Sequence, residues 1–469
     1  MSEEIWIGGV GAMLLAEGLP LREALDVTDP GGWTAFDLGV RGHVPPALLP
    51  ARPGRGRLRR VKQLTESELA LALCHPDGRI REAALDRAGD HPDLLPLVVI
   101  RSADWAEPVR ERARRLLEER LDAARAVTLA ALVLRLGRRK HGGYAVRLLG
   151  ELLRHAPGGL LEPLYADADR AVRRFARRLA VAEGLLSPAE LARVAARDDD
   201  IVVQRLCADA ALAAVVRGGA YDDVLPELLG ARNTQARAAG VTALRAAGRP
   251  EAAVVFLADR SALVRACARY VVRQGEDDPL AWYRERCARP QDVPAGAVIG
   301  LAECGQRTDA ALLWPLLGHP EARVRARAVA GLRMLDVADA ARLRPLLDDP
   351  APGVVRETVL ALLPSAAALS EAWLTQRLEA GRPRHQRVAA FRLLGARGGL
   401  GRLRAAVALV DDTDLKLRLR ARQSVRGWRP EADVRFGDPA VGELLDRARH
   451  LFGDAYCFEH LRRAAGLPY

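Results

Sequence analysis

The sequence is poor in aromatic residues, in lysine and in long uncharged apolar stretches. Aromatic residues make up 4% of the 469 residues, whereas 49% are hydrophobic. The core must therefore be built mainly from alanine, leucine and valine. Because alanine and leucine are strong helix formers, the composition favours an α-helical protein. No uncharged apolar run approaches the roughly 18 residues of a membrane span, so we expect no membrane segment.

The six cysteines are scattered, and no two of them have CxxC spacing. This pattern favours reduced, packed thiols over a disulfide framework or a zinc site. An apolar stretch at residues 5–16 follows Glu3 and Glu4, and the first basic residue is Arg22. A signal peptide would begin with positive charge. The sequence therefore predicts a cytoplasmic protein that holds no metal and no cofactor.

Sequence motifs of the common catalytic sites are also missing. The chain has no Walker A, GxSxG or HExxH motif. His75, His91 and His319 each precede a proline, which is typical of helix-capping turns and has no metal-ligand spacing. At 469 residues, the chain exceeds the size of one compact core, so it must form several domains or repeat a unit.

An arginine recurs in a fixed context along most of the chain. The last four copies are each 31 residues apart, and two wider gaps predict hidden units around residues 146–147 and 294–301. About a dozen units fit between residues 64 and 428. The recurring arginines are Arg81, Arg110, Arg173, Arg205, Arg237, Arg265, Arg325, Arg356, Arg387 and Arg418.

Each unit has the pattern of two helices joined by a turn. The residue before the arginine starts an apolar row at i, i+4 and i+8, as in Val324, Ala328 and Leu332, which is one face of a helix. A turn such as residues 319–321 precedes it. A proline such as Pro315 occurs in the segment before the turn, where it marks the first helical turn or bends the helix.

This pattern resembles the HEAT-like repeat family, especially the short bacterial form first noted in phycobilisome lyases. The clearest copy is residues 319–332 (HPEARVRARAVAGL), and the resemblance covers roughly three quarters of the chain. It implies an all-α solenoid of about twelve helix–turn–helix repeats over residues 64–428. We expect an N-terminal cap at 1–50, a basic linker at 51–63 and a C-terminal helical cap at 429–469.

The resemblance is weak evidence for function, because the family includes scaffolds, nucleic-acid binders and a few enzymes. The related deoxyhypusine hydroxylases hold iron with His-Glu pairs, and no histidine here precedes a glutamate. The related DNA glycosylases use tryptophans and an aspartate, but Asp104 and Trp105 occupy an ordinary turn position. No residue set of the bilin lyases can be carried over. We therefore assign no catalytic residue, and a lyase-type enzyme is the third function considered.

The recurring arginine is expected to bind carboxylates or carbonyls of its own or the next turn, because a role common to every unit is a stacking role. Function should lie where units differ. Residues 110–178 hold 17 basic and 8 acidic residues, whereas the net charge of the whole chain is +11. Most of the excess positive charge is therefore concentrated in one segment. The candidate binding residues there flank the recurring arginines: Arg114, Arg115, Arg174, Arg177 and Arg178.

Three possibilities stay open for the function of the chain and of its basic segment. The first hypothesis is a non-enzymatic scaffold that binds a partner protein along a concave surface formed by the second helices. The alternative is a nucleic-acid-binding protein, with or without glycosylase-like activity, that uses the basic patch. The patch can also be a solvated helix face with no ligand.

Overall fold

A computed structural model describes residues 3–50, 64–275, 277–431, 434–453 and 455–468, and within them every regular element is helical. The chain divides into two compact units, which we call unit 1 (residues 1–239) and unit 2 (residues 240–469). The basic linker predicted at 51–63 lies outside the described residues. In the described part of the chain, no helix is long and apolar enough to cross a membrane.

The described chain between residues 66 and 426 consists of twelve successive helix pairs, which confirms the predicted fold class of an all-α repeat solenoid. In all pairs but α9/α10 the first helix is shorter than the second helix or is partly of 3-10 type. Unit 1 and the boundary contain α5 (Glu66–Leu73), α6 (Gly78–Ala88), α7 (Leu95–Arg101), α8 (Glu107–Arg120), α9 (Ala123–Leu136), α10 (Gly143–Arg154), α11 (Glu162–Tyr165), α12 (Arg170–Ala182), α13 (Pro188–Arg197), α14 (Ile201–Gly218), α15 (Leu225–Leu229) and α16 (Thr234–Ala246).

The pairs continue through unit 2 in the same order of first and second helices. The elements of unit 2 are η5 (Pro250–Ala258), α17 (Ala262–Gln274), α18 (Pro279–Cys287), α19 (Ala295–Cys304), α20 (Ala310–Leu313), η8 (Trp314–Gly318), α21 (Ala322–Met334), α22 (Ala340–Leu343), η9 (Arg344–Asp348), α23 (Pro352–Leu362), η10 (Leu363–Ala368), α24 (Glu371–Gln376), α25 (Arg384–Arg397), α26 (Gly399–Ala408), α27 (Leu415–Arg426), α28 (Pro439–Arg447) and α29 (Ala455–Ala464).

Local sequence explains where the helices begin and which face they bury. Pro96, Pro163 and Pro226 occupy the first turn of α7, α11 and α15, where a proline costs no hydrogen bond. At these three positions the proline therefore marks the first turn of its helix. Pro315 follows α20 without a break, at the point where the first helix changes from α to 3-10 geometry. Asp77 caps α6 and Asp169 caps α12 by accepting a bond from the backbone N–H two residues on.

The terminal segments are helical and share cores with the adjacent repeats. α1 (Glu3–Ala16) packs against α3 (Pro30–His43), and a Cβ on Gly39 would lie only 2.5 Å from the carbonyl carbon of Gly8. This approach requires glycine. Trp33 and Phe36 of α3 belong to one buried cluster that extends along the repeats to Leu179. At the other end, buried Trp428 joins α28 and α29 to α26.

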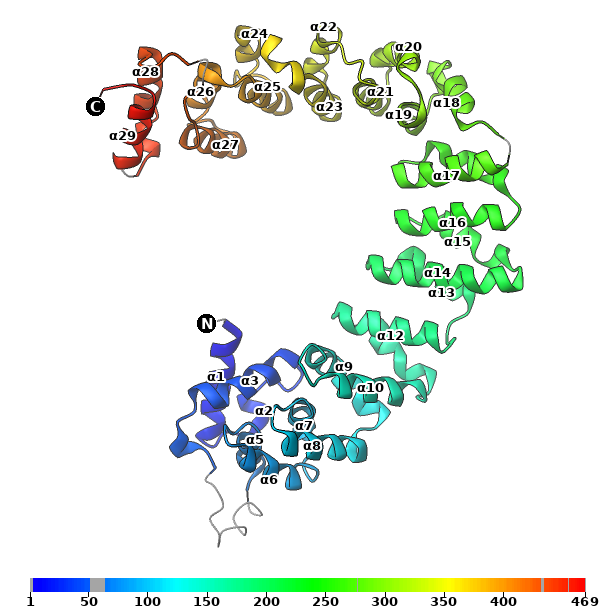
Figure 1. Cartoon of the computed structure of the whole chain (residues 1–469), viewed down its shortest axis with the longest axis vertical. Helices are drawn as coiled ribbons and strands as arrows, with labels where there is room; N and C mark the ends of the chain where they lie inside the picture. The colour runs from blue at the N-terminus through cyan, green and yellow to red at the C-terminus, as the bar shows by residue number, and fades with distance from the viewer. Residues whose placement is uncertain (1–2, 51–63, 276, 432–433, 454, 469) are drawn as a thin grey trace. The chain divides into compact units, whose positions relative to one another are not determined.

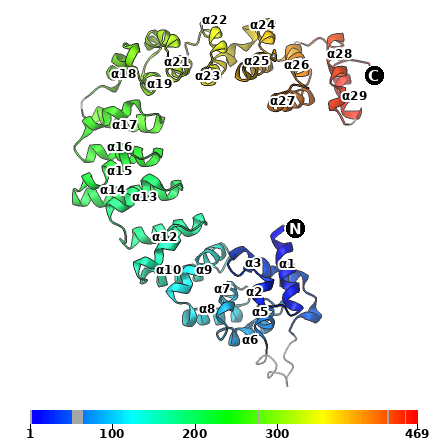
Figure 2. The ribbon, with the colours of Figure 1, turned by 180° about the vertical axis from the view of Figure 1, so that it is seen from behind.

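Within unit 2, the second helices lie side by side in one row and the first helices in another (Figures 1 and 2). α19 contacts α21, α21 contacts α23, and α23 contacts α25. The residues that begin neighbouring second helices therefore share one surface.

Candidate binding cleft

The recurring arginine holds its own turn and the next one together. The Arg325 Nη1 donates to the carbonyls of His319 at 2.8 Å and Pro320 at 3.0 Å. Its Nε and Nη2 donate to the Asp349 carboxylate of the next turn at 2.8 and 2.9 Å. Arg81 makes the same set of bonds with its own turn and with Asp104. The predicted stacking role is confirmed at these positions.

Two of the recurring arginines, Arg205 and Arg356, do not bind the turns in this way. The prediction that they take the stacking role was wrong. Arg205 has a side chain 80% exposed, and Gln204 donates instead to the Asp198 carbonyl at 2.8 Å. Arg356 is 71% exposed, and buried Val355 stands where the arginine would be. In both helices the buried row starts one residue earlier than uniform spacing predicts, which turns the arginine outward.

In unit 1 the recurring arginine belongs to a buried ionic cluster. Asp104 accepts bonds from Arg81 and from Arg101 Nη1, the latter at 2.8 Å. Arg101 also binds Asp37 of α3, which in turn accepts a bond from Arg41 at 2.8 Å. Three guanidinium groups thus face two carboxylates, so the cluster carries an excess positive charge.

The first two predicted binding arginines lie on α8 and differ in their surroundings. Arg114 donates to Glu111 at 3.0 Å and to the carbonyl of Ser102 at 3.3 Å, and it stacks 4.6 Å from the centre of the Tyr144 ring. Arg115 is exposed. Only Arg115 of this pair presents an open guanidinium group.

The other three predicted arginines lie on α12, with α9 and α10 between them and α8 (Figures 1 and 2). Arg174 donates to buried Asp200 at 2.9 Å, and Arg177 stacks 4.0 Å from the centre of the Tyr165 ring. Arg178 is exposed. The structure therefore places the five predicted arginines on two second helices separated by one helix pair, and only Arg115 and Arg178 among them are exposed.

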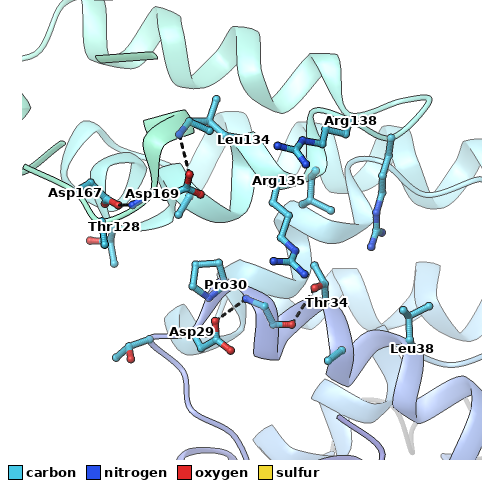
Figure 3. A pocket seen from close by; sticks show the side chains of 18 residues that line it. Asp29, Pro30, Thr34, Leu38, Thr128, Leu134, Arg135, Arg138, Asp167 and Asp169 are labelled. Carbon is cyan, nitrogen blue, oxygen red and sulfur yellow. Dashed lines mark hydrogen bonds between the residues drawn. The ribbon is translucent and has the colours of Figure 1, made fainter. Parts of the chain in front are cut away.

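A cleft of about 830 Å³ lies in the same segment of unit 1, where α9, the start of α3 and the start of α12 meet (Figure 3). Arg135 and Arg138 lie on one side of it, and Asp167 and Asp169 on the other (Figure 3). The apolar residues of its lining are Pro30, Ala35, Leu38, Ala131, Leu134, Leu136, Ala168 and Ala171.

The carboxylates of the cleft are held by backbone N–H groups. Asp29 caps α3 by accepting bonds from Gly31 and Gly32, both at 2.8 Å. Asp169 accepts from Ala171 at 2.7 Å, and Asp167 from the Asp169 N–H at 2.7 Å. Helix N-termini stabilise these charges. Asp167 and Asp169 form the negative wall of the cleft, whereas Asp29 lies on the side of Arg135.

The opposite wall is positive. Burial lowers the pKa of Arg139 and the charge of Asp37 raises it, but the charges of Arg101, Arg41 and Arg135 lower it again, so the net shift is downward. Arg139 thus lies beside the excess positive charge of the buried ionic cluster. An anion bound at this wall would relieve the repulsion among these groups.

Sequence analysis selected the correct segment and missed the residues of the cleft. Arg135, Arg138 and Arg139 all fall within residues 110–178. One sequence feature could have indicated the cleft. This is the run Arg138, Arg139 and Lys140, which follows the end of α9 and stands outside the recurring-arginine pattern. The partners Asp29 and Thr34 come from α3, about a hundred residues earlier, and no sequence spacing indicates them.

The repeats contain buried thiols whose pKa values are raised. No cluster of three or more histidine, cysteine or carboxylate side chains suited to a metal occurs among the residues searched, which are those that the structure describes. Burial raises the pKa of the Cys207 thiol to about 11 and that of the Cys287 thiol to about 12. These thiols stay protonated at neutral pH, and a protonated thiol is a poor nucleophile.

Comparison with known proteins gives distant structural likeness only. No protein-family model and no curated protein matches the chain. A crystal structure of importin beta aligns with 97% of this chain and 70% of its own, at 12% identity and a TM-score of 0.33. A mutant of Kap121p aligns with 90% of this chain and 53% of its own, at 12% identity and a TM-score of 0.25.

Tubulin-recruiting microtubule polymerases with TOG domain arrays align with 84% of this chain and 97% of their own, at 10% identity and a TM-score of 0.23. All three TM-scores are too low to carry a functional argument. The resemblance to the short, phycobilisome-lyase-type repeats stays a prediction.

Proposed function

We propose that the chain is a non-enzymatic scaffold that binds a partner protein, and that the cleft of unit 1 takes a polypeptide segment of that partner. The observation that carries the proposal is the pairing of a positive and a negative wall over an apolar floor. A polypeptide offers both signs of charge and apolar side chains within a few residues, so it complements all three surfaces. The short bacterial HEAT-like form is the repeat type we propose for this scaffold.

Nucleic acid complements the cleft less well. Its phosphates would meet the carboxylates of Asp29, Asp167 and Asp169 as well as the arginines. Single strands bind by stacking bases on aromatic side chains, and the described lining of the cleft includes none. Arg115 and Arg178 are exposed, so they are the residues through which the alternative, nucleic-acid binding, would act.

Affinity capture from a native lysate tests the proposal with two matched double variants. Arg138→Glu with Arg139→Glu reverses the positive wall, whereas Arg115→Glu with Arg178→Glu reverses two exposed arginines outside the cleft. We expect a stoichiometric protein that the first variant loses and the second retains. Recovery of no stoichiometric protein would refute the proposal. Salt-sensitive DNA or RNA that only the second variant loses would support the alternative.

We also propose a reducing, cytoplasmic location. Cys74, Cys207 and Cys287 are buried as free thiols, although oxidising compartments favour disulfides in exported proteins. Mass spectrometry of the protein denatured and alkylated at the moment of lysis tests this: we expect all three thiols to be reduced and therefore alkylated.

A further inference from the structure

A second open surface lies in unit 2, across the beginnings of the neighbouring second helices α19, α21 and α23. It is a groove of about 760 Å³. Its floor consists of small residues, and its lining also holds two glutamates and five arginines. Four of these arginines are exposed, whereas Arg265 is buried and pairs with Glu303. The floor is Ala295, Gly296, Ala322, Ala326, Ala351 and Gly353.

The arginines of α21 supply open positive charge to this groove. Arg323 and Arg327 are one helical turn apart, so both side chains lie on one face of α21. Both are exposed, and neither forms an ion pair with another described residue. Glu357 does not offset them, because it lies 3.1 Å from Arg356 and 3.9 Å from Arg333.

The backbone adds to the positive character of the groove. α21 begins at Ala322 and α23 at Pro352, and neither helix has a side-chain cap on its first N–H groups. Such N–H groups favour negative charge nearby. The groove is therefore positive both in its side chains and along its floor.

The dimensions fit an extended chain. Helices packed about 8–10 Å apart place α19 and α23 about 16–20 Å from each other. An extended polypeptide advances about 3.3 Å per residue, so roughly five or six residues cross the three helices. The described lining holds no aromatic side chain on which a nucleic-acid base could stack.

We propose that this groove binds an extended, acidic polypeptide segment. The assignment rests on the proposed scaffold function and names the chemistry of one partner segment, at a surface separate from the cleft of unit 1. Acidic side chains pair with Arg323 and Arg327, and the small floor lets the peptide backbone lie close to α21 and α23.

Gly353 provides a test that does not disturb the fold. A Cβ built there meets nothing within 4 Å, so a larger side chain enters the groove and not the core. Gly395 of α25 is also helical and open, and it lies outside the groove, so it is the matched control.

The experiment measures fluorescence anisotropy of a labelled peptide of alternating glutamate and alanine, titrated with the full chain at low salt. The same peptide with lysine in place of glutamate is the ligand control. We expect Gly353→Trp, and separately Arg323→Glu with Arg327→Glu, to weaken glutamate-peptide binding about tenfold or more, which is about 1.4 kcal/mol. Arg392 of α25 and Arg420 of α27 are exposed and lie outside the groove lining, so they provide the charge control. Gly395→Trp, and Arg392→Glu with Arg420→Glu, should bind as the wild type does.

Equal affinity for the glutamate and lysine peptides would overturn the assignment, as would wild-type affinity in both groove variants. Loss of peptide binding in Arg138→Glu with Arg139→Glu alone would also overturn it, because the peptide would then occupy the cleft of unit 1. The purified assay is independent of lysate capture. If the glutamate peptide does not bind but a partner is captured from the lysate, the groove assignment alone is refuted. If the peptide binds but no partner is captured, the scaffold function as tested is refuted.

Discussion

Replacing Asp104 by asparagine removes the one carboxylate that two buried arginines share. Asp104 accepts from Arg81 Nε at 3.0 Å and Nη2 at 2.8 Å, and from Arg101 Nη1 at 2.8 Å. The side chains of all three residues are at most 1% exposed. Burial alone would raise the pKa of Asp104, but the bonds from Arg81 and the charge of Arg101 outweigh it and lower the pKa. The carboxylate is therefore ionised at neutral pH.

The asparagine variant leaves both guanidinium groups buried with too little negative charge. Removing one partner of a buried ion pair costs about 3–5 kcal/mol, and we expect a loss of that size in the stability of α5–α8. Native-state hydrogen exchange of the amides in these helices measures it, because exchange reports local opening.

Asp93→Asn is the matched control. Asp93 pairs with Arg22 at 2.7 Å, but the two side chains are 42% and 70% exposed. Exposed pairs contribute about 0–1 kcal/mol, so the control should exchange almost as the wild type does. If Asp104→Asn also stays within about 1 kcal/mol of the wild type, the stacking role of the recurring arginine is refuted.

Two further predictions concern recurring arginines of other repeats and the carboxylate that one of them binds. Arg237→Ala should destabilise the protein by about 1–3 kcal/mol in urea unfolding, because buried Arg237 satisfies the carbonyls of Ala231 and Arg232. Arg205→Ala should change stability by less than about 0.5 kcal/mol, and equal losses would contradict the corrected register. Burial alone would raise the pKa of Glu303, but the hydrogen bonds from Arg265 and Arg269 outweigh the effect of burial. The net result is a pKa below the ordinary value of 4.5. Its stabilising effect is complete above pH 4.5 and is lost as pH falls through the folded-state pKa. Glu303→Gln should therefore flatten the acid limb of stability in urea unfolding against pH, and an unchanged limb would contradict this.

Sequence alone determined the repeat, the helix pairs and the role of most recurring arginines. These features are local. Val324, Ala328 and Leu332 define a buried face because they are one turn apart on a helix, and Arg325 reaches carbonyls only five or six residues away. Such short-range geometry recurs in most units, so periodicity is sufficient to predict it there.

Tertiary structure decided the register of individual helices and the location of the open surfaces. Arg205 fits the spacing as well as Arg173 does, yet packing of α14 turns Arg205 to solvent. The cleft joins Arg138 to Asp29 from a distant segment, and the groove joins the starts of three helices. Which segments meet depends on how the pairs stack, and no local spacing in the sequence encodes that.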